Sequence, residues 1–395
     1  MNHKIFFPSL LLLFMLLVSC GSNRQKEPSY NHFTLEEKKF VHALFLSEYL
    51  WYDKVKKDIN YTAFTTPQEL VDALRVYPSD RWSFTISKQQ YEDYVNQKTS
   101  GFGFGYISDF TIYTVRIDSP AYKKLFRGDT ILKINGENVS HEKIAQAAKN
   151  TNIKTRFTVE RNHTEVEVNI TPKEYTFKVS LGKIITHNNL KVGYLRYDSF
   201  SGSSVEELEK IFTKFKDNHI SELVIDLRYN GGGSITVASA LLDNITNAYP
   251  GQRQGYLDWN DKYKDKNEDF SFEELDDQDG NELSMQRVVF LVTKNSASAS
   301  ELVISALKPY LGDMNVITVG KDTHGKPVGM SGKVFNDNYY FLINFIVRNK
   351  VNETTPFEGI AVTCKAEDNL SYQRGDINEP MLKTALYYID YDSCP

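Results

Sequence analysis

Cysteine is scarce in this chain. Only 3 of its 395 residues are cysteines, which excludes a small fold held together by a framework of disulfide bonds. The 8 histidines are scattered along the chain, without the short spacings that zinc ligands require. We therefore expect no metal and no other cofactor in the functional site.

The chain also lacks an excess of positive charge. Its 46 Lys and Arg residues face 51 Asp and Glu residues, for a formal net charge of -5. No Lys/Arg cluster provides the basic surface that a nucleic-acid-binding protein needs. With 41% hydrophobic and 13% aromatic residues, the chain can bury large cores, and its length favours two or three domains. We therefore expect a globular protein that does not bind nucleic acid.

Long apolar runs are absent beyond the N-terminus. There, Lys4 precedes an apolar run from Leu10 to Val18, which is typical of an export signal and too short to span a bilayer comfortably. The residues Leu17-Val18-Ser19-Cys20 resemble the lipobox of bacterial lipoproteins, which implies cleavage before Cys20 and lipidation of its thiol. Residues 1–20 are thus expected to be a lipoprotein signal peptide, with an ordinary secretory signal as the alternative. A lipidated Cys20 would anchor the protein to a membrane of the cell envelope, outside the cytoplasm, without crossing it.

Two cysteines remain after the signal, Cys364 and Cys394. An exported compartment is oxidising enough for them to form a disulfide. A chain of this size does not need such a bond, so the sequence slightly favours two buried, unpaired thiols.

Residues 21–98 are expected to form a tether followed by a small helical region. Thr34 opens a capping box, and apolar residues follow it at helical spacing. A second helix starts at Thr66, with Pro67 in its first position. Aromatic residues such as Trp82 predict core or contact surface here, so the sequence assigns this region no chemistry.

Residues 99–174 predict a compact β-rich module of short alternating strands. Its first turn is Gly101-Phe102-Gly103-Phe104-Gly105, and Arg127-Gly128-Asp129-Thr130 and Asn135-Gly136 follow further on. Together these segments look like a PDZ domain of the bacterial type. The resemblance implies that the backbone at Gly101, Phe102, Gly103 and Phe104 binds the terminal carboxylate of a peptide, which adds to the module as a strand.

Residues 175–395 predict an α/β domain. Strands and helices alternate, which implies crossover connections and a central sheet. Leu223 to Leu227 is a continuous apolar run, typical of a fully buried strand. From about residue 249 to 282 the chain is rich in Asp, Lys, Gln and Asn. We expect this stretch to be a polar surface insertion that could border the cleft.

Three segments of this domain carry candidate chemistry. The segment Asn295-Ser296-Ala297-Ser298-Ala299-Ser300-Glu301 predicts a strand-to-helix turn, and the free N–H groups of the helix start can hold an oxyanion. Asp226 to Gly233 ends a buried strand in a glycine run that can present amides to a carbonyl, with Asp226 and Arg228 expected to tie the turn together. Gly320 to Gly329 supplies Lys326, which can act as base for a serine if burial lowers its pKa.

These three segments, in this order and after the PDZ-like module, resemble the C-terminal processing, or tail-specific, serine peptidases. The resemblance covers the chain from about residue 100 to its end. It implies Ser298 as nucleophile, Lys326 as general base, and the amides of Ala299 and Gly232 as oxyanion hole. The residues alone do not choose among Ser296, Ser298 and Ser300.

The resemblance also implies a fold and a function. The expected fold is multidomain α/β, with a Clp protease/crotonase-like peptidase core, the PDZ-like module and the N-terminal helical region. The expected function is that of a serine endopeptidase of the Ser/Lys dyad type. It would cleave proteins or peptides that are recruited by their free C-termini in the cell envelope.

One position departs from the family pattern. Many members carry a glutamine four residues after the lysine to orient it, and this chain has Met330 there, whose thioether is a weak acceptor. His324 is a rival base, because Ser-His pairs are common in hydrolases, but Lys326 matches the motif better. Two other functions stay open: a non-catalytic peptide-binding lipoprotein with the same fold, and a crotonase-like acyl-transfer enzyme that binds coenzyme A. The PDZ-like module argues against the second.

Overall fold

The computed structural model describes residues 33–274 and 280–395. The expected signal peptide with Cys20, the tether up to residue 32, and residues 275–279 of the expected insertion lie outside this part. Residues 97–177 form one compact unit, and residues 33–96 with 178–395 form a second, larger one. Within the described residues, no helix is both long enough and apolar enough to cross a membrane.

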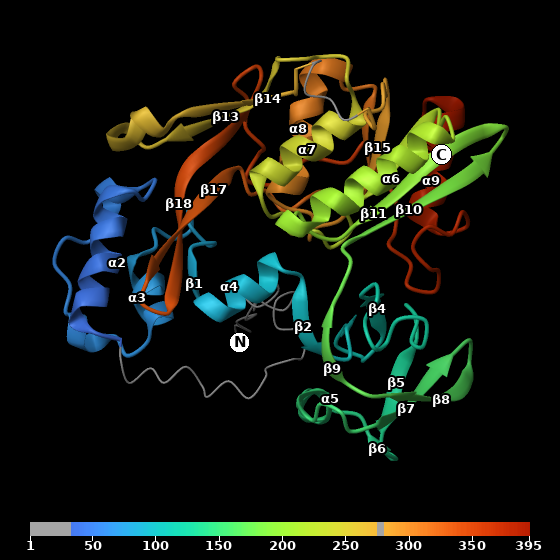
Figure 1. The fold of residues 1–395 in the computed structure, drawn as a ribbon, viewed down its shortest axis with the longest axis horizontal. Helices are drawn as coiled ribbons and strands as arrows, with labels where there is room; N and C mark the ends of the chain where they lie inside the picture. The colour runs from blue at the N-terminus through green and yellow to red at the C-terminus, as the bar shows by residue number, and fades with distance from the viewer. Residues whose placement is uncertain (1–32, 275–279) are drawn as a thin grey trace, which may run out of the picture. The chain divides into compact units, whose positions relative to one another are not determined.

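The larger unit is built on a six-stranded sheet (Figure 1), with strand order β10-β11-β12-β15-β16-β19. β10 and β11 pair antiparallel, and each later pair is parallel. The strands are β10 (Ser180–His187), β11 (Leu190–Tyr197), β12 (Glu222–Asp226), β15 (Val288–Val292), β16 (Val316–Gly320) and β19 (Cys364–Lys365). The parallel pairs require crossover connections, and a helix lies in each connection from β11 to β16, whereas the connection from β16 to β19 contains no helix. The predicted alternation of strands and helices is thus confirmed.

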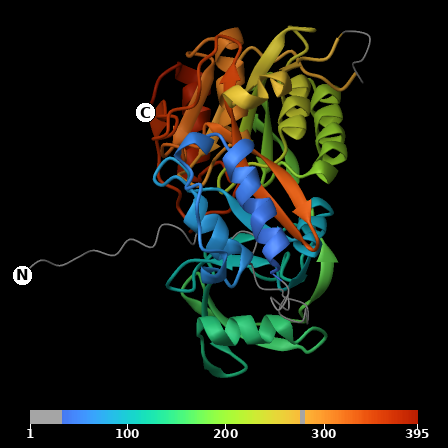
Figure 2. The same cartoon turned by 90° about the vertical axis from the view of Figure 1, so that its left-hand side faces the viewer.

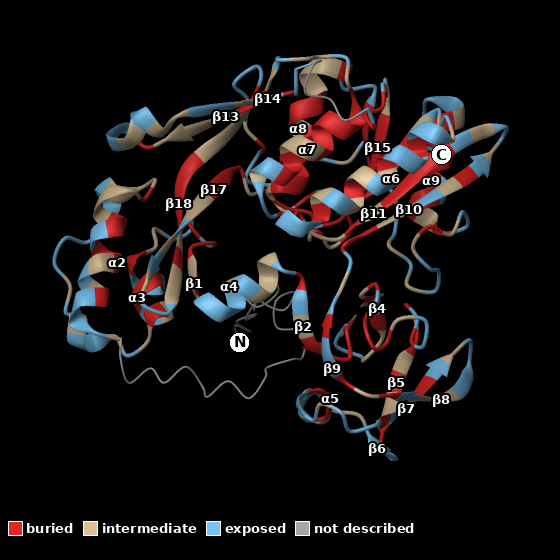
Figure 3. Cartoon of the chain, in the orientation of Figure 1, coloured by how far each residue is buried: buried red, intermediate tan, exposed pale blue. Residues whose placement is uncertain are grey.

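Helices cover both faces of this sheet. α6 (Val205–Asp217), α7 (Ile235–Ile245) and α8 (Ala299–Leu311) lie along one face, as Figure 1 shows. α9 (Pro380–Tyr391) packs in one hydrophobic cluster with side chains of the other face. Strands covered on both sides are apolar throughout, and Figure 3 shows β11 and β15 largely in the colour of buried residues. The predicted buried strand at Leu223–Leu227 is β12.

A second sheet belongs to the same unit. Its central strand β18 (Asn338–Asn349) pairs with β17 (Val328–Phe335) along one edge. β1 (Phe84–Ser87) and β13 (Arg253–Trp259) pair with the other edge, and β14 (Glu268–Ser271) pairs with β13. The expected polar insertion at 249–282 therefore contains two strands, joined by the 3-10 helix η5 (Asp261–Lys266). Their exposed faces carry charged residues, which hide the strand pattern in the sequence.

The N-terminal helices share a core with this second sheet (Figures 1 and 2). The elements are α2 (Leu35–Ser47), η2 (Tyr52–Lys54), η3 (Tyr61–Ala63), α3 (Pro67–Leu74) and α4 (Lys88–Val95). Buried residues of α2 and α3 form one hydrophobic cluster with Val328, Tyr340, Leu342 and Ile343 of β17 and β18. A pair of short helices cannot bury enough apolar surface alone, so these helices need the sheet.

Both predicted helix starts in this region are confirmed, but the predicted capping box at Thr34 is only half formed, because the carboxylate of Glu37 accepts from Asn338 and Tyr340 instead. The hydroxyl of Thr34 accepts a hydrogen bond from the N–H of Glu37 at 3.1 Å. Thr66 and Glu69 form a reciprocal capping box at the start of α3, with Pro67 in the first turn. Such caps satisfy N–H groups that have no partner within the helix.

The smaller unit, residues 97–177, is β-rich as predicted. We call it the inserted module. Its elements are β2 (Lys98–Gly101), β3 (Phe104–Tyr106), β4 (Ile112–Val115), β5 (Thr130–Ile134), β6 (Glu137–Asn138), α5 (His141–Lys149), β7 (Thr155–Arg161), β8 (Thr164–Ile170) and β9 (Lys173–Thr176). β2 pairs with β9, β3 pairs with β4, and a sheet of order β6-β5-β7-β8 completes the module. Its likeness to a PDZ domain stays a prediction.

Cys364 and Cys394 form a disulfide bond, with an S–S distance of 2.03 Å. The prediction of two unpaired thiols is therefore wrong. Cys364 is buried in β19, and Cys394 follows α9, which packs against the same sheet. The last residues of the chain, 391–395, are exposed, so they have little packing of their own. A local segment with little packing can need a covalent bond even where the chain as a whole does not.

Replacing Cys394 with serine is expected to lower the free energy of unfolding by about 3 kcal/mol, because the bond closes a loop with a sequence separation of 30. Guanidinium unfolding of the variant and of the wild type measures this difference. Reductant should destabilise the wild type by a similar amount and leave the variant unchanged. Equal stabilities without reductant would show that the bond contributes nothing.

Candidate active site

The segment Asn295–Glu301 forms the turn between β15 and α8, as predicted. Ser298 is the N-cap of α8 and has φ 57° and ψ -115°. Positive φ is uncommon for a residue other than glycine and costs about 1–3 kcal/mol. Such a conformation persists only where its surroundings hold it, and it is frequent at functional sites. The turn places Ser298 at a helix N-terminus, where N–H groups and the helix dipole favour negative charge.

The three serines of this turn have different surroundings. Ser296 is fully buried, and its hydroxyl donates to the carbonyl of Leu227 at 2.8 Å. Ser300 is also fully buried and donates to the carbonyl of Asn230 at 2.9 Å. Both hydroxyls thereby tie the serine turn to the segment that follows β12. Ser298 is the partly exposed one of the three. The structure therefore distinguishes Ser298 from the other two serines as the candidate nucleophile, which the sequence pattern alone does not do.

The glycine run ends β12 directly beside Ser298. Gly232 has φ 104°, and a Cβ atom on it would lie 2.8 Å from Ser298 Cβ and 3.0 Å from the nitrogen of Ala299. Only a residue without a side chain fits there. The N–H of Gly232 donates to Asn230 Oδ1 at 2.9 Å. The N–H of Ala299 donates to no acceptor within residues 33–274 and 280–395. Of the two predicted oxyanion amides, one is therefore available and the other is engaged.

Glu301 joins the serine turn to the loop that contains Lys326. Its buried carboxylate accepts hydrogen bonds from the N–H groups of Ser298 at 2.8 Å, Gly325 at 2.7 Å and Lys326 at 2.9 Å, and from the hydroxyl of Thr323. Four donors compensate a charge that would otherwise be costly to bury. The sequence pattern gave Glu301 no chemical role. The Ser-x-x-Glu spacing of a capping box, from Ser298 to Glu301, is the signal that could have found this link.

Lys326 lies in the loop between β16 and β17. Burial lowers the pKa of its ammonium group to about 8, although the carboxylates of Asp80 and Glu301 act in the opposite direction. Near pH 8 about half of such amines are neutral, and only the neutral amine can accept a proton. The loop therefore has the chemistry that the resemblance requires of a general base.

His324, the rival base, already uses the lone pair of its ring. The indole N–H of Trp82 donates to Nε2 at 3.2 Å, so the ring proton lies on Nδ1. Burial lowers the pKa of His324, against the effect of the nearby Glu301 carboxylate. A neutral imidazole has one lone pair, and because this lone pair accepts from Trp82, none is free for a serine.

Replacing His324 with glutamine is therefore expected to change kcat/KM by less than about 10-fold, because the ring takes no part in proton transfer. The measurement is cleavage of an unfolded protein at pH 9, where the wild-type lysine is mostly neutral. Thermal unfolding of the same variant should show a lower midpoint, since the contact with Trp82 is lost. A loss of activity of 1,000-fold or more with the fold intact would restore His324 as the base.

Buried ion pairs support the glycine turn, as the sequence predicted for Asp226 and Arg228. Both side chains are fully buried, and they pair at 2.7 Å. Arg228 also pairs with Asp368 and Glu379, each at 2.9 Å, and Arg374 pairs with Asp226 at 3.0 Å. Burial alone would raise the pKa of Asp226, but Arg228 and Arg374 hold it well below its usual range. The three partners from the C-terminal segment were missed, because no local pattern marks contacts over such a sequence separation.

The predicted peptide-binding loop lies in the inserted module, where Phe102 and Phe104 are buried in the core. Their side chains stack on each other with ring centroids 5.9 Å apart. Gly103 has φ 86°, and a Cβ atom there would lie 2.2 Å from Ser119 Cβ. Within the described residues, the N–H groups of Phe102 and Gly103 donate to no acceptor. The loop, which begins at Gly101, thus offers backbone and not side chains.

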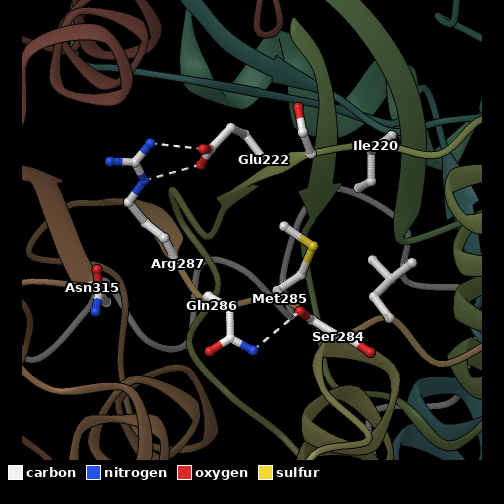
Figure 4. A pocket seen from close by; sticks show the side chains of 9 residues that line it. Ile220, Glu222, Ser284, Met285, Gln286, Arg287 and Asn315 are labelled. Atoms are coloured by element: carbon white, nitrogen blue, oxygen red, sulfur yellow. Dashed lines mark hydrogen bonds and ion pairs between the residues drawn. The ribbon is translucent and has the colours of Figure 1, made fainter.

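A cavity of about 520 Å³ lies elsewhere in the larger unit (Figure 4). Its lining residues are Ile220, Ser221, Glu222, Leu283, Ser284, Met285, Gln286, Arg287 and Asn315. Glu222, Arg287 and Asn315 stand at the starts of β12, β15 and β16, whereas the serine turn follows the end of β15. Because parallel strands start at one edge of a sheet and end at the other, this cavity is not part of the Ser298 site. Its arginine is already paired with Glu222 at 2.7 Å.

Comparison with known proteins identifies the class to which this fold and site belong. The model of peptidase family S41 matches residues 191–361, and the model of the peptidase S41 N-terminal domain matches residues 36–84. The chain belongs to peptidase family S41. The predicted family and the predicted α/β fold class are therefore confirmed.

Particular relatives include proteases from two bacteria. The chain is 28% identical over 208 residues to a carboxyl-terminal-processing protease of Picosynechococcus, an alignment that covers 50% of this chain and 46% of the relative. It is 25% identical over 278 residues to a protein named as a CtpA-like serine protease of Staphylococcus aureus, covering 63% of this chain and 51% of the relative. The chain thus spans about half the length of the curated relatives it matches.

A solved structure supports the fold. The crystal structure of a Bacteroides fragilis protein assigned to the S41 proteases superposes with a TM-score of 0.77 at 24% identity, covering 89% of this chain and 97% of that chain. A further structure, of a cpaf s499a mutant, superposes with a TM-score of 0.51 at 13% identity, covering 91% of this chain and 98% of that one. At these identities the likeness concerns the fold alone.

Proposed function

We propose that this protein is a serine endopeptidase that uses Ser298 and Lys326 as a catalytic dyad. The observation that carries the proposal is the position of Glu301, whose carboxylate binds the N–H groups of both residues. One buried group thus connects a strained serine at a helix N-terminus with a lysine whose pKa is about 8. The match to peptidase family S41 supports the same reaction class.

In the proposed reaction, the neutral amine of Lys326 takes the hydroxyl proton of Ser298 while Oγ attacks the peptide carbonyl carbon. The lysine then gives this proton to the leaving amine as the C–N bond breaks. A water molecule attacks the acyl-enzyme while Lys326 accepts one of its protons, and Lys326 gives this proton to Ser298 Oγ as the bond from Oγ to the acyl carbon breaks and the carboxylic acid product leaves. Lys326 thus takes up one proton and gives one up in each half of the reaction, so no further acid or base is needed.

Negative charge on the carbonyl oxygen is proposed to be stabilised at the start of α8. The N–H of Ala299 is available for it, and the helix dipole adds to the effect. Gly232 supplies the second N–H when that group exchanges Asn230 Oδ1 for the substrate oxygen. Removing one such donor typically costs 100- to 1,000-fold in rate.

The inserted module is proposed to recruit substrates by their free C-termini, as a PDZ-like domain does. The N–H groups of Phe102 and Gly103, which have no acceptor within the described part of the chain, support this role, because several amides in one turn attract a carboxylate. A lipid on Cys20 is proposed to anchor the protein to a membrane of the cell envelope, outside the cytoplasm. Labelling of growing cells with a clickable fatty acid tests the anchor. Wild type should take up the label, and a Cys20→Ala variant should not.

Digestion of an unfolded protein tests the enzymatic proposal. Fragments are measured by mass spectrometry between pH 6 and pH 10, and a fluorophosphonate reagent is applied in parallel. We expect fragments to accumulate above about pH 8 and the reagent to label Ser298, since both need an activated serine. No fragments and no label at any pH would favour the non-catalytic peptide-binding alternative.

A further inference from the structure

Asp80 is a fully buried carboxylate in the N-terminal region. Its Oδ1 accepts hydrogen bonds from the N–H groups of Trp82 and Ser83, both at 2.9 Å. Its Oδ2 accepts the hydroxyl of Tyr49 at 2.8 Å. All of these donors are neutral, so they fix the carboxylate in place without neutralising its charge. In a buried site, such a charge acts strongly on its neighbours.

The segment after Asp80 lies against the loop of Lys326. The side chain of Trp82 donates to His324 at 3.2 Å, two residues before the lysine. Trp82 also belongs to the same hydrophobic cluster as Val328, two residues after it. The N–H of Ile343 in β18 donates to the hydroxyl of Ser83 at 3.1 Å. Contacts on both sides of the lysine therefore hold Asp80 and the loop in one cluster.

Several ionisable groups lie in or against this cluster besides Lys326. Tyr49 donates to Asp80, Arg75 donates to the carbonyl of Ser83 at 3.3 Å and pairs with Asp72, and Lys294 donates to the carbonyl of Thr323 at 2.8 Å. Asp80 and Glu301 act on the ammonium group of Lys326, and both raise its pKa against the lowering caused by burial. His324 is neutral, and Arg81 donates to the carbonyl of Phe357 at 3.3 Å. Glu301 is compensated by four donors from the serine turn and the lysine loop. Asp80 forms no ion pair within the described residues, so no cation at ion-pair distance compensates its charge.

In many family members a glutamine four residues after the lysine orients the amine, but Met330, which stands at this position here, cannot do so. Met330 packs against the hydrophobic cluster of the N-terminal helices and β18, and it pairs with Ile343 in the β17–β18 ladder. A thioether in an apolar cluster neither orients an amine strongly nor stabilises an ammonium ion. The group that orients the amine of Lys326 and stabilises its ammonium form must therefore lie outside β17.

We propose that Asp80 is a positioning residue for Lys326 and supplies the fixed counter-charge for the ammonium ion that forms when the lysine takes the Ser298 proton. This inference rests on the proposed Ser/Lys mechanism. The proton moves from Ser298 Oγ to Lys326 Nζ as the bond from Oγ to the carbonyl carbon forms, so positive charge develops on a buried amine. A buried cation is costly unless an anion lies near it. The N-terminal region thereby completes the catalytic site instead of only packing against it.

The test is the pH dependence of kcat/KM for an unfolded protein, measured for the full chain and for an Asp80→Asn variant. Asparagine keeps the size of the side chain and the acceptor for Trp82 and Ser83 but removes the charge. The acid limb of the profile is the range in which activity rises with pH as the lysine loses its proton. We expect this limb to move to lower pH than in wild type, because the lysine loses a group that raises its pKa. We also expect the plateau at high pH to fall by about 10- to 100-fold, because the ammonium ion is less stabilised. A purely structural role would lower the plateau without moving the limb.

Two further variants separate the effect of the charge of Asp80 from the effect of its hydrogen bonds. Tyr49→Phe removes one hydrogen bond to Asp80 and leaves its charge, so it should lower the thermal midpoint while the acid limb stays in place. Asp80→Glu restores the charge on a longer side chain, and its limb should return toward that of wild type. If Asp80→Asn does not fold, Asp80→Ser replaces it, since a hydroxyl can still accept from the N–H two residues on.

An acid limb in Asp80→Asn or Asp80→Ser that coincides with wild type would overturn the inference. The outcome differs from a failure of the proposed function. If wild type does not cleave, or if Ser298→Ala still cleaves, the Ser/Lys mechanism itself is wrong. If Ser298→Ala is inactive and the acid limb does not move, only the role of Asp80 is wrong.

Discussion

Replacing Ser298 with alanine is expected to lower kcat/KM for an unfolded protein by at least about 10,000-fold and to leave the fold intact. The variant removes the oxygen that would bond to the substrate carbonyl, and no neighbouring hydroxyl can take its place. Ser296 and Ser300 are fully buried and donate to backbone carbonyls. The free energy of unfolding should fall by only about 1 kcal/mol, because alanine keeps the same Cβ atom at the positive φ and only the hydroxyl of the N-cap is lost. Fragment yield and thermal unfolding measure the two effects.

The neighbouring serines are the matched controls for this prediction. Ser296→Ala and Ser300→Ala each leave a buried carbonyl without its donor, which costs about 1–3 kcal/mol in the free energy of unfolding. Their activity should fall less than that of Ser298→Ala, because they position the turn without reacting. If Ser296→Ala or Ser300→Ala were the inactive and stable variant, the nucleophile would be assigned to the wrong residue.

Replacing Lys326 with methionine is expected to lower kcat/KM by about 1,000- to 10,000-fold on the plateau near pH 10, and by less at lower pH, where the wild-type lysine is protonated. Methionine has a similar length and no titratable group. In wild type, activity should be low below pH 8 and should rise through about pH 8 to a plateau, because the neutral amine is the active form. The variant should lack this limb altogether. Lys326→Arg should be equally inactive, since a guanidinium group stays protonated at all these values.

Lys321→Met is the control for the lysine. Lys321 lies in the same loop, is exposed, and pairs with Glu367 at 2.9 Å on the surface. Its loss should leave both the plateau and the acid limb of kcat/KM unchanged, because exposed ion pairs contribute little. A Lys326→Met protein that keeps its activity, next to a normal Lys321→Met protein, would remove the lysine from the mechanism.

The sequence predicted those parts of the site that depend on residues close together in the chain. The turn from β15 into α8 follows from a buried apolar strand, small residues and a helical apolar face. The glycine run at the end of β12 was likewise recognisable in the sequence. Its composition follows from the structure, because only glycine fits where Gly232 approaches Ser298. The choice of Ser298 among three serines was not visible. It depends on hydrogen bonds to Leu227 and Asn230, which are far away in the sequence.

The contacts that sequence reasoning missed all join distant segments. Trp82 was assigned to the core, and its ring does pack there, but its N–H also reaches His324. Asp80 lies in a turn with no motif, and its burial follows only from the packing of the N-terminal helices on β18. The disulfide between Cys364 and Cys394 needs the knowledge that α9 packs beside β19. Residue identity gives the chemistry available to a side chain, and the tertiary fold decides which chemistry is used.

The inserted module enters and leaves the chain at neighbouring residues. The N–H of Phe177 donates to the carbonyl of Gln97 at 3.1 Å, and the side chain of Gln97 donates back to the carbonyl of Phe177 at 2.6 Å. β2 and β9 continue this pairing from Lys98 and Thr176 inward. A segment whose ends meet in this way can be gained, lost or exchanged as one insertion, without changing the path of the chain on either side. The inserted module, which is proposed to select substrates, can therefore evolve separately from the larger unit, which is proposed to cleave them. The same larger unit can then be combined with modules that select different substrates.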